Sequence, residues 1–409
     1  MSPLISVTTA RLGDHLPLLD LLPDAEPLSW VRNGEGLVGW GVHATTTISG
    51  ANRFREARAW WHQQLEAFAI TDSVHSTGTG PILFSSFSFS PEEDSVLVIP
   101  KVVVGTRGSN SWITWIGEEA QPNLLGHIES LTSPQYSWRD GTISAPEWQS
   151  KVAEAITAIG DGEIEKVVLA RDLVATAASE IDPRLILRNL SANYPSTWTF
   201  AVDGLVGATP ELLLRLNRGM VTSRVLAGTI RRTGDDEKDL ALAASLARSS
   251  KDLEEHDFAV RSVADSLATF CPSTNVPDSP FVLHLANVMH LATDVTGAVA
   301  DTPQRIDVFS ILEKLHPSAA VCGTPTESAA KVIARLEGMS RQRYAGPVGW
   351  IDAKGDGELG IALRCGQIEK NEIRLFAGCG IVSGSIPERE FAESQVKFLP
   401  MESALQESS

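Results

Sequence analysis

Short turns between apolar, alternating segments constrain the fold of this chain more than any other feature of its sequence. Residues 30–50 are expected to form two strands around Asn33-Gly34, and residues 348–366 a hairpin around Asp356-Gly357. Because such short turns join antiparallel neighbours, we expect mostly antiparallel sheets and an α+β fold rather than a doubly wound parallel fold. Other strands are expected at residues 82–89, 95–104, 112–116, 164–174, 198–206 and 212–216, the last two joined by a turn at 207–210.

Helical patterns are interleaved with these strands. The segment at residues 118–146 is rich in Pro, Ser, Gly and Gln, and is the best candidate for a linker. Neither a GxGxxG fingerprint nor a Walker loop is present, which argues against the usual nucleotide sites. Helices are expected at residues 54–68, 148–159, 238–267 with a break near Ser249-Ser250, 306–315 and 327–338.

The charge and the cysteine content argue against several classes of protein. A net charge of −17 without a basic block argues against a nucleic-acid binder or a binder of anionic membranes. An anionic substrate therefore needs a metal ion or a few placed Arg and Lys residues. The four cysteines form no C-x-x-C pair, which suits a reduced compartment better than a disulfide or zinc framework. The first residues lack a basic signal-peptide region, and no run of about 18 apolar residues occurs, so we expect a soluble, cytoplasmic protein.

The stretch from Phe376 to Lys397 combines a glycine-rich turn with a charged helix. Its glycines allow the backbone to approach a ligand closely. Ser385 is expected to be the N-cap of the helix, in a capping box with the glutamate three residues later. Glu390, Glu393 and Lys397 then share one helix face, where they can hold a cation and an anionic ligand together. A solvated, salt-bridged helix end is the alternative.

Two charged residues stand in otherwise apolar strands. In IEKVVLARDLV both faces around Lys166 are apolar, so we expect a partly desolvated lysine with a lowered pKa that can act as a general base. The alternative is a strand-end lysine that reaches solvent. Glu211 begins the apolar strand ELLLRL, and such a carboxyl can have a raised pKa and act as a general acid. A plain strand-end glutamate is the alternative.

Further motifs offer groups for binding. Asp252 and Glu255 stand at i and i+3 on a helix, a spacing that suits two carboxylates facing one hard cation, although periodicity does not choose between Glu254 and Glu255 as the inward residue. Arg364 is expected on a strand, where it can clamp a carboxylate. Other candidates are the open backbone and hydroxyl of Gly228 and Thr229, His316 at a helix exit, and Tyr344 beside a turn.

Together these motifs resemble those of the chorismate-utilising enzymes, and most closely those of the isochorismate synthases. The match covers residues 165–405, and the N-terminal pieces PLSW, GWG and FSSFSFSP match more loosely. The motifs occur in the order expected of that family: KVVLAR, GATPE, LAGT, KDLEEH, HPSAAVCGTP, YAGPVGW, AGCGIV and SIPEREFAESQVK.

The resemblance implies a fold and a set of roles. It implies one large domain of two packed, mostly antiparallel sheets with helices outside, in which residues 1–140 supply the N-terminal part of the sandwich and residues 145–405 the catalytic region. It also implies Mg²⁺ held by Glu255 and Glu393, with Glu390 and Asp252 close by. Lys166 would activate water for attack at C2 of chorismate, and Glu211 would protonate the leaving C4 hydroxyl. Substrate contacts would come from Gly228, Thr229, Tyr344, Arg364, Gly378, Gly380 and Lys397, with His316 close to the ring.

The same resemblance leaves alternatives. An aminodeoxychorismate synthase usually has a lysine where Ala227 stands, and anthranilate synthases typically show a GAPK-like turn instead of residues 323–326. A salicylate synthase shares the base, acid and metal residues and adds pyruvate elimination. A non-catalytic chorismate or metal sensor on the same scaffold is a further alternative. The chain departs from the commoner pattern at Ser318-Ala319 and Cys379. We expect a monomer that needs no glutaminase partner.

Overall fold

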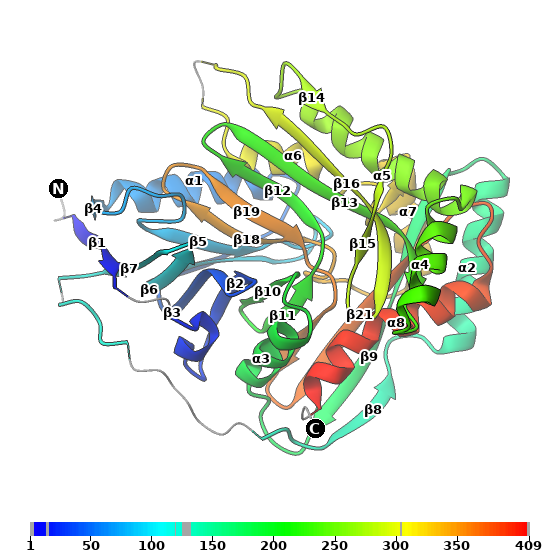
Figure 1. Ribbon diagram of the computed structural model, residues 1–409, viewed down its shortest axis with the longest axis horizontal. Coiled ribbons are helices and arrows are strands. Elements are labelled where there is room, and N and C mark those ends of the chain that lie inside the picture. The colour runs from blue at the N-terminus through cyan, green and yellow to red at the C-terminus, as the bar shows by residue number, and fades with distance from the viewer. Residues whose placement is uncertain (1–3, 14–15, 119, 125–131, 303–304, 407–409) are drawn as a thin grey trace.

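The strands form two arms of one hydrogen-bonded network, which meet at the long strand β6 (Ser95–Arg107). The computed structural model describes residues 4–13, 16–118, 120–124, 132–302 and 305–406. Strand β3 (Glu35–Ile48) pairs with β6 along one edge, whereas β5 (Ile82–Ser86) and β7 (Asn110–Ile116) share its other edge. The two arms diverge from this point (Figure 1).

The first arm contains the paired strands β3 and β6 and continues beyond each of them. Beyond β7 it continues through β1 (Ile5–Leu12) to β4 (Phe68–Asp72), and β1–β4 is the parallel pair among the described strands. Beyond β3 the order is β2 (Leu28–Arg32), β10 (Trp198–Val202), β11 (Leu205–Thr209), β20 (Cys365–Glu369), β21 (Glu372–Ile381) and β9 (Lys166–Ala177). The outer edge of β9 pairs with β8 (Tyr136–Asp140) at one end and with β17 (Gly323–Thr324) at the other.

The second arm starts at β5 and is antiparallel throughout its described strands. Its order is β5, β18 (Pro347–Asp352), β19 (Gly357–Ile361), β12 (Leu212–Asn217), β13 (Met220–Arg231) and β16 (Val288–Ala298). Two short strands, β14 (Thr274–Asn275) and β15 (Phe281–His284), pair with β16. The expected α+β fold of two mostly antiparallel sheets is thereby confirmed.

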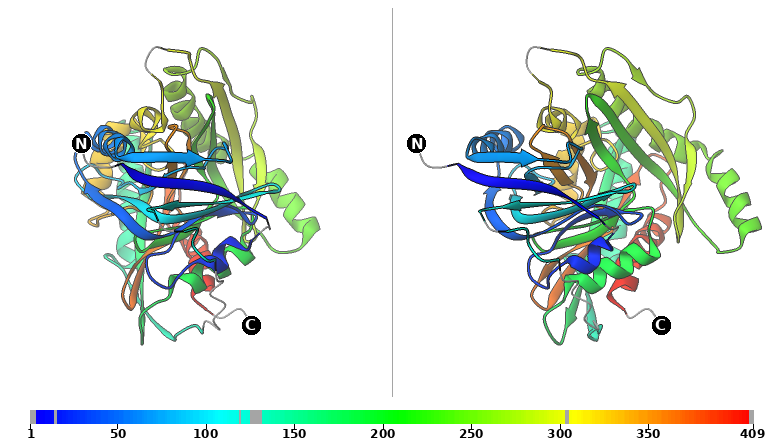
Figure 2. Two further views of the ribbon diagram at one scale, coloured as in Figure 1. Left: turned by 90° about the vertical axis from the view of Figure 1, so that its left-hand side faces the viewer. Right: turned by 60° about the vertical axis from the view of Figure 1, so that its left-hand side comes forward.

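Helices cover the outside of both arms, and local sequence signals start several of them. A capping box of Ser144 and Glu147 begins α2, Asp182 caps α3, and Ser249 caps α5. Although far apart in sequence, α1 and α6 lie side by side, joined by the Arg55–Glu313 ion pair (Figure 2). The helices are η1 (Leu18–Leu21), α1 (Arg53–Glu66), α2 (Ala145–Gly160), α3 (Pro183–Asn193), α4 (Asp236–Leu246), α5 (Ser250–Ala268), α6 (Val308–Leu315), α7 (Thr326–Leu336) and α8 (Pro387–Leu405). In the part of the chain that the structure describes, none of the helices has the length and apolar character of a membrane span.

Two large buried clusters hold the arms and helices together. The larger joins both arms to α1, α2, α5, α6 and α7, and it contains Trp30, Phe200 and Trp350. The second lies where η1, α3 and α8 cover the first arm, around Leu187 and Met401. Full burial of each such large side chain contributes roughly 1.5–3 kcal/mol. These clusters fix how the strands that carry polar residues face one another.

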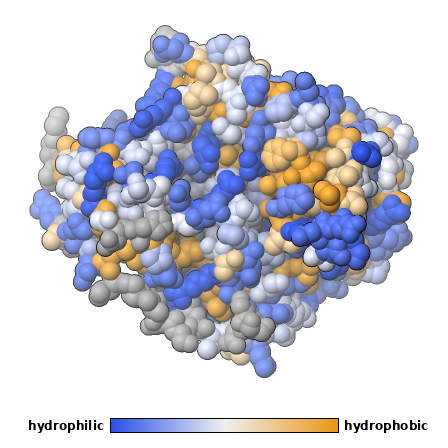
Figure 3. Space-filling model, viewed as in Figure 1, coloured by the Kyte–Doolittle hydropathy of each residue, from blue (hydrophilic) through white to orange (hydrophobic). Residues whose placement is uncertain are grey.

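A smaller apolar cluster lies under α4, at the edge of the second arm. Ala243 and Leu246 of α4 pack there on Met289 and Leu291 of β16. The molecular face drawn in Figure 3 is mostly polar but shows an apolar area over β15, β16 and α4. Large apolar side chains remain exposed on these elements, for example Leu240, which is 71% exposed. The helix α4 therefore covers this edge only in part.

Three sequence-based boundaries are wrong. The expected linker at 118–146 contains β8, because its residues 136–140 find a partner in the distant β9. The strand expected at 198–206 is two strands, since the chain turns at Asp203-Gly204 with φ of 49° and 76°, and residues 207–209 belong to β11 rather than to the next turn. The hairpin ends at Ile361, because Arg364, with φ of 48°, turns the chain from the second arm into the first.

Candidate active site

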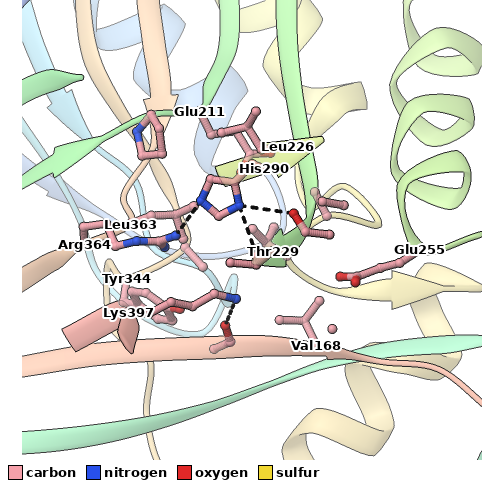
Figure 4. A pocket seen from close by; sticks show the side chains of 18 of the residues that line it. Val168, Glu211, Leu226, Thr229, Glu255, His290, Tyr344, Leu363, Arg364 and Lys397 are labelled. Carbon is pink, nitrogen blue, oxygen red and sulfur yellow. Dashed lines mark hydrogen bonds between the residues drawn. The ribbon is translucent and has the colours of Figure 1, made fainter. Parts of the chain in front are cut away.

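A cavity lies between the two arms and gathers most of the residues singled out in the sequence. It encloses about 580 Å³ of empty space, part of it open to solvent. Its walls come from β9, β13, β16, β21, α5 and α8 and from the connections around Glu211, Tyr344 and Arg364 (Figure 4). The lining residues are Val168, Pro210, Glu211, Leu226, Ala227, Gly228, Thr229, Glu255, His290, Ala320, Val321, Arg341, Tyr344, Ala345, Leu363, Arg364, Gly378, Gly380 and Lys397.

Glu211 is held at a break between two strands of different arms. Pro210 ends β11, and the Glu211 N–H donates to Thr209 Oγ1 at 3.2 Å, while its carbonyl accepts from the Ile361 N–H at 3.2 Å. The residue is only 5% exposed. Burial raises the pKa of Glu211 to about 8, although Lys166 and Arg364 oppose the shift. Glu211 is therefore a neutral acid at pH 7, as the sequence predicted.

Lys166 is the first residue of β9 and is fully buried. Its Nζ donates to the Glu255 carbonyl at 3.3 Å and lies 3.6 Å from Glu255 Oε1. Burial lowers the pKa of Lys166, and the carboxylates of Glu255 and Glu211 partly offset this shift. The expected desolvation is confirmed, and the alternative of a lysine reaching solvent is wrong. Lys166 is absent from the cavity lining because Glu255 stands in front of it.

Two glycines of β21 make room for functional side chains. A Cβ on Gly380 would lie 2.0 Å from Glu255 Oε1 and 3.2 Å from Lys166 Cε. A Cβ on Gly378 would lie 3.0 Å from the Tyr344 hydroxyl, whose ring stacks on Phe376 with centroids 5.2 Å apart. Both glycines thus allow other groups to come close to the backbone, as the sequence indicated, but the nearest groups are side chains of the protein itself.

A β-bulge at Gly228 shapes the opposite wall. The register between β13 and β16 shifts there, and Gly228 has φ of 78°. The bulge brings Thr229 Oγ1 to 3.1 Å from His290 Nδ1, and the Gly228 carbonyl lies 3.3 Å from the same atom. Arg364 Nη2 donates to His290 Nε2 at 3.2 Å, so Nδ1 carries the proton (Figure 4).

His290 is a site residue that the sequence reasoning missed. Burial, with Arg364 as the next cause, lowers the pKa of His290 well below its usual value, so the ring is neutral. It orients the Arg364 guanidinium, which lines the cavity from a connection between strands rather than from a strand as expected. A polar residue inside the apolar strand VMHLAT is the same signal that singled out Lys166.

His316 lies outside the cavity, which corrects its expected place near the ring of a substrate. Its Nε2 donates to the Phe89 carbonyl at 3.3 Å, and its ring packs edge-on against Phe54 and Phe89. Burial lowers the pKa of His316 to about 3. It is a core histidine, because α6 ends against the aromatic cluster rather than against the cavity.

Carboxylates of α5 and α8 meet beside the cavity, each next to an ammonium group. Lys397 Nζ lies 2.6 Å from Glu393 Oε1 and donates to the Gly378 carbonyl at 2.8 Å. Lys251, another residue that sequence reasoning missed, lies 2.6 Å from Glu390 Oε1. The sequence left Glu254 and Glu255 open as the inward residue, and the structure exposes Glu254 and turns Glu255 inward.

These carboxylates fit a hard divalent cation by their chemistry. Burial raises the pKa of Glu255, and the charge of Glu393 raises it further. Burial alone would raise the pKa of Glu393, but Lys397 brings it below the usual value. Among the described residues, ligand atoms of Cys379, Glu390 and Glu393 lie within 4.8 Å of one another, a group that contains a thiol and includes neither Glu255 nor Asp252. Crowded carboxylate oxygens are the donors that Mg²⁺ prefers, and a cation relieves their mutual repulsion.

Two expected details of this region differ. Ser385 is not the N-cap of α8, which starts at Pro387 after Ile386. Instead the Ser385 hydroxyl accepts from the Val382 N–H at 3.2 Å and closes the turn before the helix. Asp252 is not a cavity-lining residue: it packs against Gly228, where an added Cβ would lie 3.0 Å from Asp252 Cβ.

Comparison with known proteins relates both arms to one family. A family model described as "Chorismate binding enzyme" matches residues 28–406. The chain is 32% identical over 403 residues to isochorismate synthase MenF of Bacillus subtilis, covering 90% of this chain and 85% of that protein. It is 32% identical over 344 residues to isochorismate synthase EntC of Escherichia coli, covering 83% and 85%. The solved structure of MenF, the menaquinone-specific isochorismate synthase from Escherichia coli, superposes with a TM-score of 0.81 at 25% identity, covering 99% of this chain and 95% of that one.

Proposed function

This chain belongs to the chorismate-binding enzyme family, and from that membership we propose that it isomerises chorismate to isochorismate. The observation that carries the proposal is the pair of opposed pKa shifts around one cavity, with Glu211 in its lining and Lys166 buried behind Glu255. Burial raises the pKa of Glu211 to about 8 and lowers the pKa of Lys166. Two groups pushed in opposite directions supply an acid and a base at the same pH.

The proposed reaction exchanges one hydroxyl for another. Lys166 takes a proton from water as the water oxygen bonds to C2 of the ring. The ring double bonds shift, and the C4–oxygen bond breaks. Glu211, as a neutral acid, gives its proton to the departing hydroxyl, which leaves as water. One water enters and one leaves, so no oxidant, reductant or nitrogen donor is needed, and we expect the chain to act without a glutaminase.

Binding of a dianion needs local positive charge in a protein of net charge −17. Arg364 and Lys397 line the cavity and supply two such charges. The backbone of Gly378 and Gly380 and the hydroxyls of Thr229 and Tyr344 border the same space. We propose that these groups hold the two carboxylates and the ring of chorismate.

We propose Mg²⁺ as the metal, held by Glu255 and Glu393 with Glu390 and Asp252 nearby. When bound, the ion would neutralise a substrate carboxylate. The support is the carboxylate crowding between α5 and α8, where the charge of Glu393 acts on Glu255. Because Lys397 pairs with Glu393, this lysine also limits the repulsion between the two carboxylates when no cation is bound.

The test is chromatography of a reaction of the purified chain with chorismate, with and without Mg²⁺. We expect isochorismate, no salicylate, and loss of turnover when EDTA removes the metal, with recovery on adding Mg²⁺. Stoichiometric pyruvate would instead identify a salicylate synthase. Calorimetric binding of chorismate without any product would identify a sensing protein and refute the proposed activity.

A further inference from the structure

The outer edge of β9 has a gap between its two partner strands. β17 pairs with residues 166–167, and β8 pairs with residues 173–177. In between, the Val168 N–H still donates to the Cys322 carbonyl at 2.8 Å, but the Val168 carbonyl and both backbone groups of Ala170 face this edge without a neighbouring strand. These groups are buried, and a buried backbone group left without a partner is costly, so something else must satisfy them.

Side chains take the place of the missing strand. Arg341 Nη2 donates to the Val168 carbonyl at 2.7 Å, and Glu337 Oε1 accepts from the Ala170 N–H at 2.7 Å. Trp148 Nε1 donates to the Ala170 carbonyl at 3.1 Å. Arg341 and Glu337 also pair with each other, with Nε 2.9 Å from Oε2. The pair therefore continues the sheet by offering a donor and an acceptor as a strand would.

Arg341 also ties this edge to the rest of the cavity wall. Its Nη1 donates to the Val321 carbonyl at 2.8 Å, and its own carbonyl accepts from the Tyr344 N–H at 2.9 Å. Val168, Val321, Tyr344 and Arg341 itself all line the cavity. One guanidinium thus joins two separate parts of the wall, at Val321 and at Val168, which lies two residues after Lys166 on β9. The Arg341 backbone carbonyl holds a third part at Tyr344.

We propose that Arg341 is a positioning residue for the reaction, acting through β9 and the 320–321 connection on the placement of Lys166 and of the substrate. This inference rests on the proposed isomerase function. Arg341 is only 3% exposed, and its guanidinium donates to Val168, Val321 and Glu337, so it acts through the wall rather than on the reacting atoms. The planar fork of arginine reaches three directions at once, which lysine does not.

Arg343 provides a matched control two residues away. It is also buried, at 6% exposed, and it donates to the carbonyls of Val202 and Asp203 and to Gln367 Oε1. It contributes nothing to the cavity lining. Loss of its hydrogen bonds therefore measures the cost of disturbing a buried arginine in this segment without disturbing the cavity wall.

The experiment compares Arg341→Lys with Arg343→Lys, because lysine keeps a positive charge at each position. Calorimetric titration with chorismate counts the folded sites, and turnover is then expressed per bound site. We expect Arg341→Lys to keep its binding stoichiometry and to lose about tenfold to 100-fold in turnover per site, the loss typical of a small misplacement of reacting groups. Arg343→Lys should have the same turnover per site as the wild type.

A second readout does not depend on turnover. Hydrogen exchange of the segment 166–172 should be faster in Arg341→Lys than in wild type and unchanged in Arg343→Lys. If Arg341→Lys does not fold, the double variant Arg341→Met with Glu337→Met removes both charges together and is expected to show the same two effects.

The outcomes separate the two proposals. Equal turnover per site in the Arg341 and Arg343 variants, or unchanged exchange of segment 166–172 in the Arg341 variant, overturns the positioning role. A wild-type chain that produces no isochorismate refutes the proposed function instead, and the exchange measurement then still decides whether Arg341 holds β9 in place.

Discussion

Replacement of Glu211 by glutamine should abolish turnover and at the same time stabilise the fold. The substitution keeps the size of the side chain and an oxygen that can accept from the Leu226 N–H, as Glu211 does. It removes the proton that the acid gives to the leaving hydroxyl, and general acid catalysis of this kind contributes about 10²- to 10⁴-fold in rate. It also removes a carboxyl that is costly to ionise where it lies.

The expected stabilisation follows from the raised pKa. An ordinary glutamate has a pKa of 4.5, whereas burial raises the pKa of folded Glu211 to about 8. Between these values the folded protein binds a proton that the unfolded chain has lost, so this carboxyl makes the fold less stable as pH rises. At pH 7 this carboxyl lowers the free energy of unfolding by about 3 kcal/mol, because each pH unit above 4.5 contributes roughly 1.4 kcal/mol. This effect is absent below pH 4.5 and levels off above pH 8.

Urea unfolding at pH 5 and pH 7.5 measures this difference, and Glu254→Gln on the exposed face of α5 is the control. We expect the free energy of unfolding of Glu211→Gln to be higher than that of the wild type, by a difference that grows with pH. The free energy of unfolding of Glu254→Gln should follow that of the wild type. In the wild type, kcat/KM should fall above about pH 8 as Glu211 loses its proton. A variant with the same pH dependence of stability as the wild type, or one that retains turnover, would refute the reasoning.

Three other substitutions test the cavity, and a fourth outside it serves as a control. Lys166→Met should fold and lose turnover, since the buried amino group of the proposed base is replaced by an apolar group of similar length; near-normal steady-state rates would remove Lys166 from the role of base. Gly380→Ala should weaken activation by Mg²⁺, because its Cβ would lie 2.0 Å from Glu255 Oε1; an unchanged Mg²⁺ titration would contradict this. His290→Ala should raise KM by about tenfold or more, because the cavity arginine loses its acceptor. His316→Ala, measured beside it, should leave the KM unchanged, and equal effects of the two histidines would count against the site as drawn.

Local signals in the sequence determined most of the elements. Alternation and short turns predicted antiparallel strands, and helical periodicity predicted the break between α4 and α5 at Ser249. Where the pattern failed, the cause was a distant partner. The segment of β8 has a weak strand signal of its own and becomes a strand because β9 pairs with it. Propensity cannot register a partner that lies far away along the chain.

The residues of the candidate site also divide into those that the sequence indicated and those that it did not. Lys166 and Glu211 stood out because each interrupts an apolar strand, and burial then shifted their pKa values as expected. His290 carries the same signal and accepts from Arg364 at the site, whereas His316, which the family motif places near the substrate, lies in the core. A polar residue on an apolar face must meet a partner, but alternation does not say which partner.

The sequence by itself determined the order of the elements, the family motifs and the residues that burial would perturb. Only the tertiary structure decided that Glu255 faces the cavity and Glu254 the solvent, that a bulge at Gly228 brings Thr229 to His290, and that Arg341 bridges the edge of β9. The physical reason is that these contacts join strands and helices of different arms. Their geometry depends on how the two arms pack, and no local stretch of the chain contains that information.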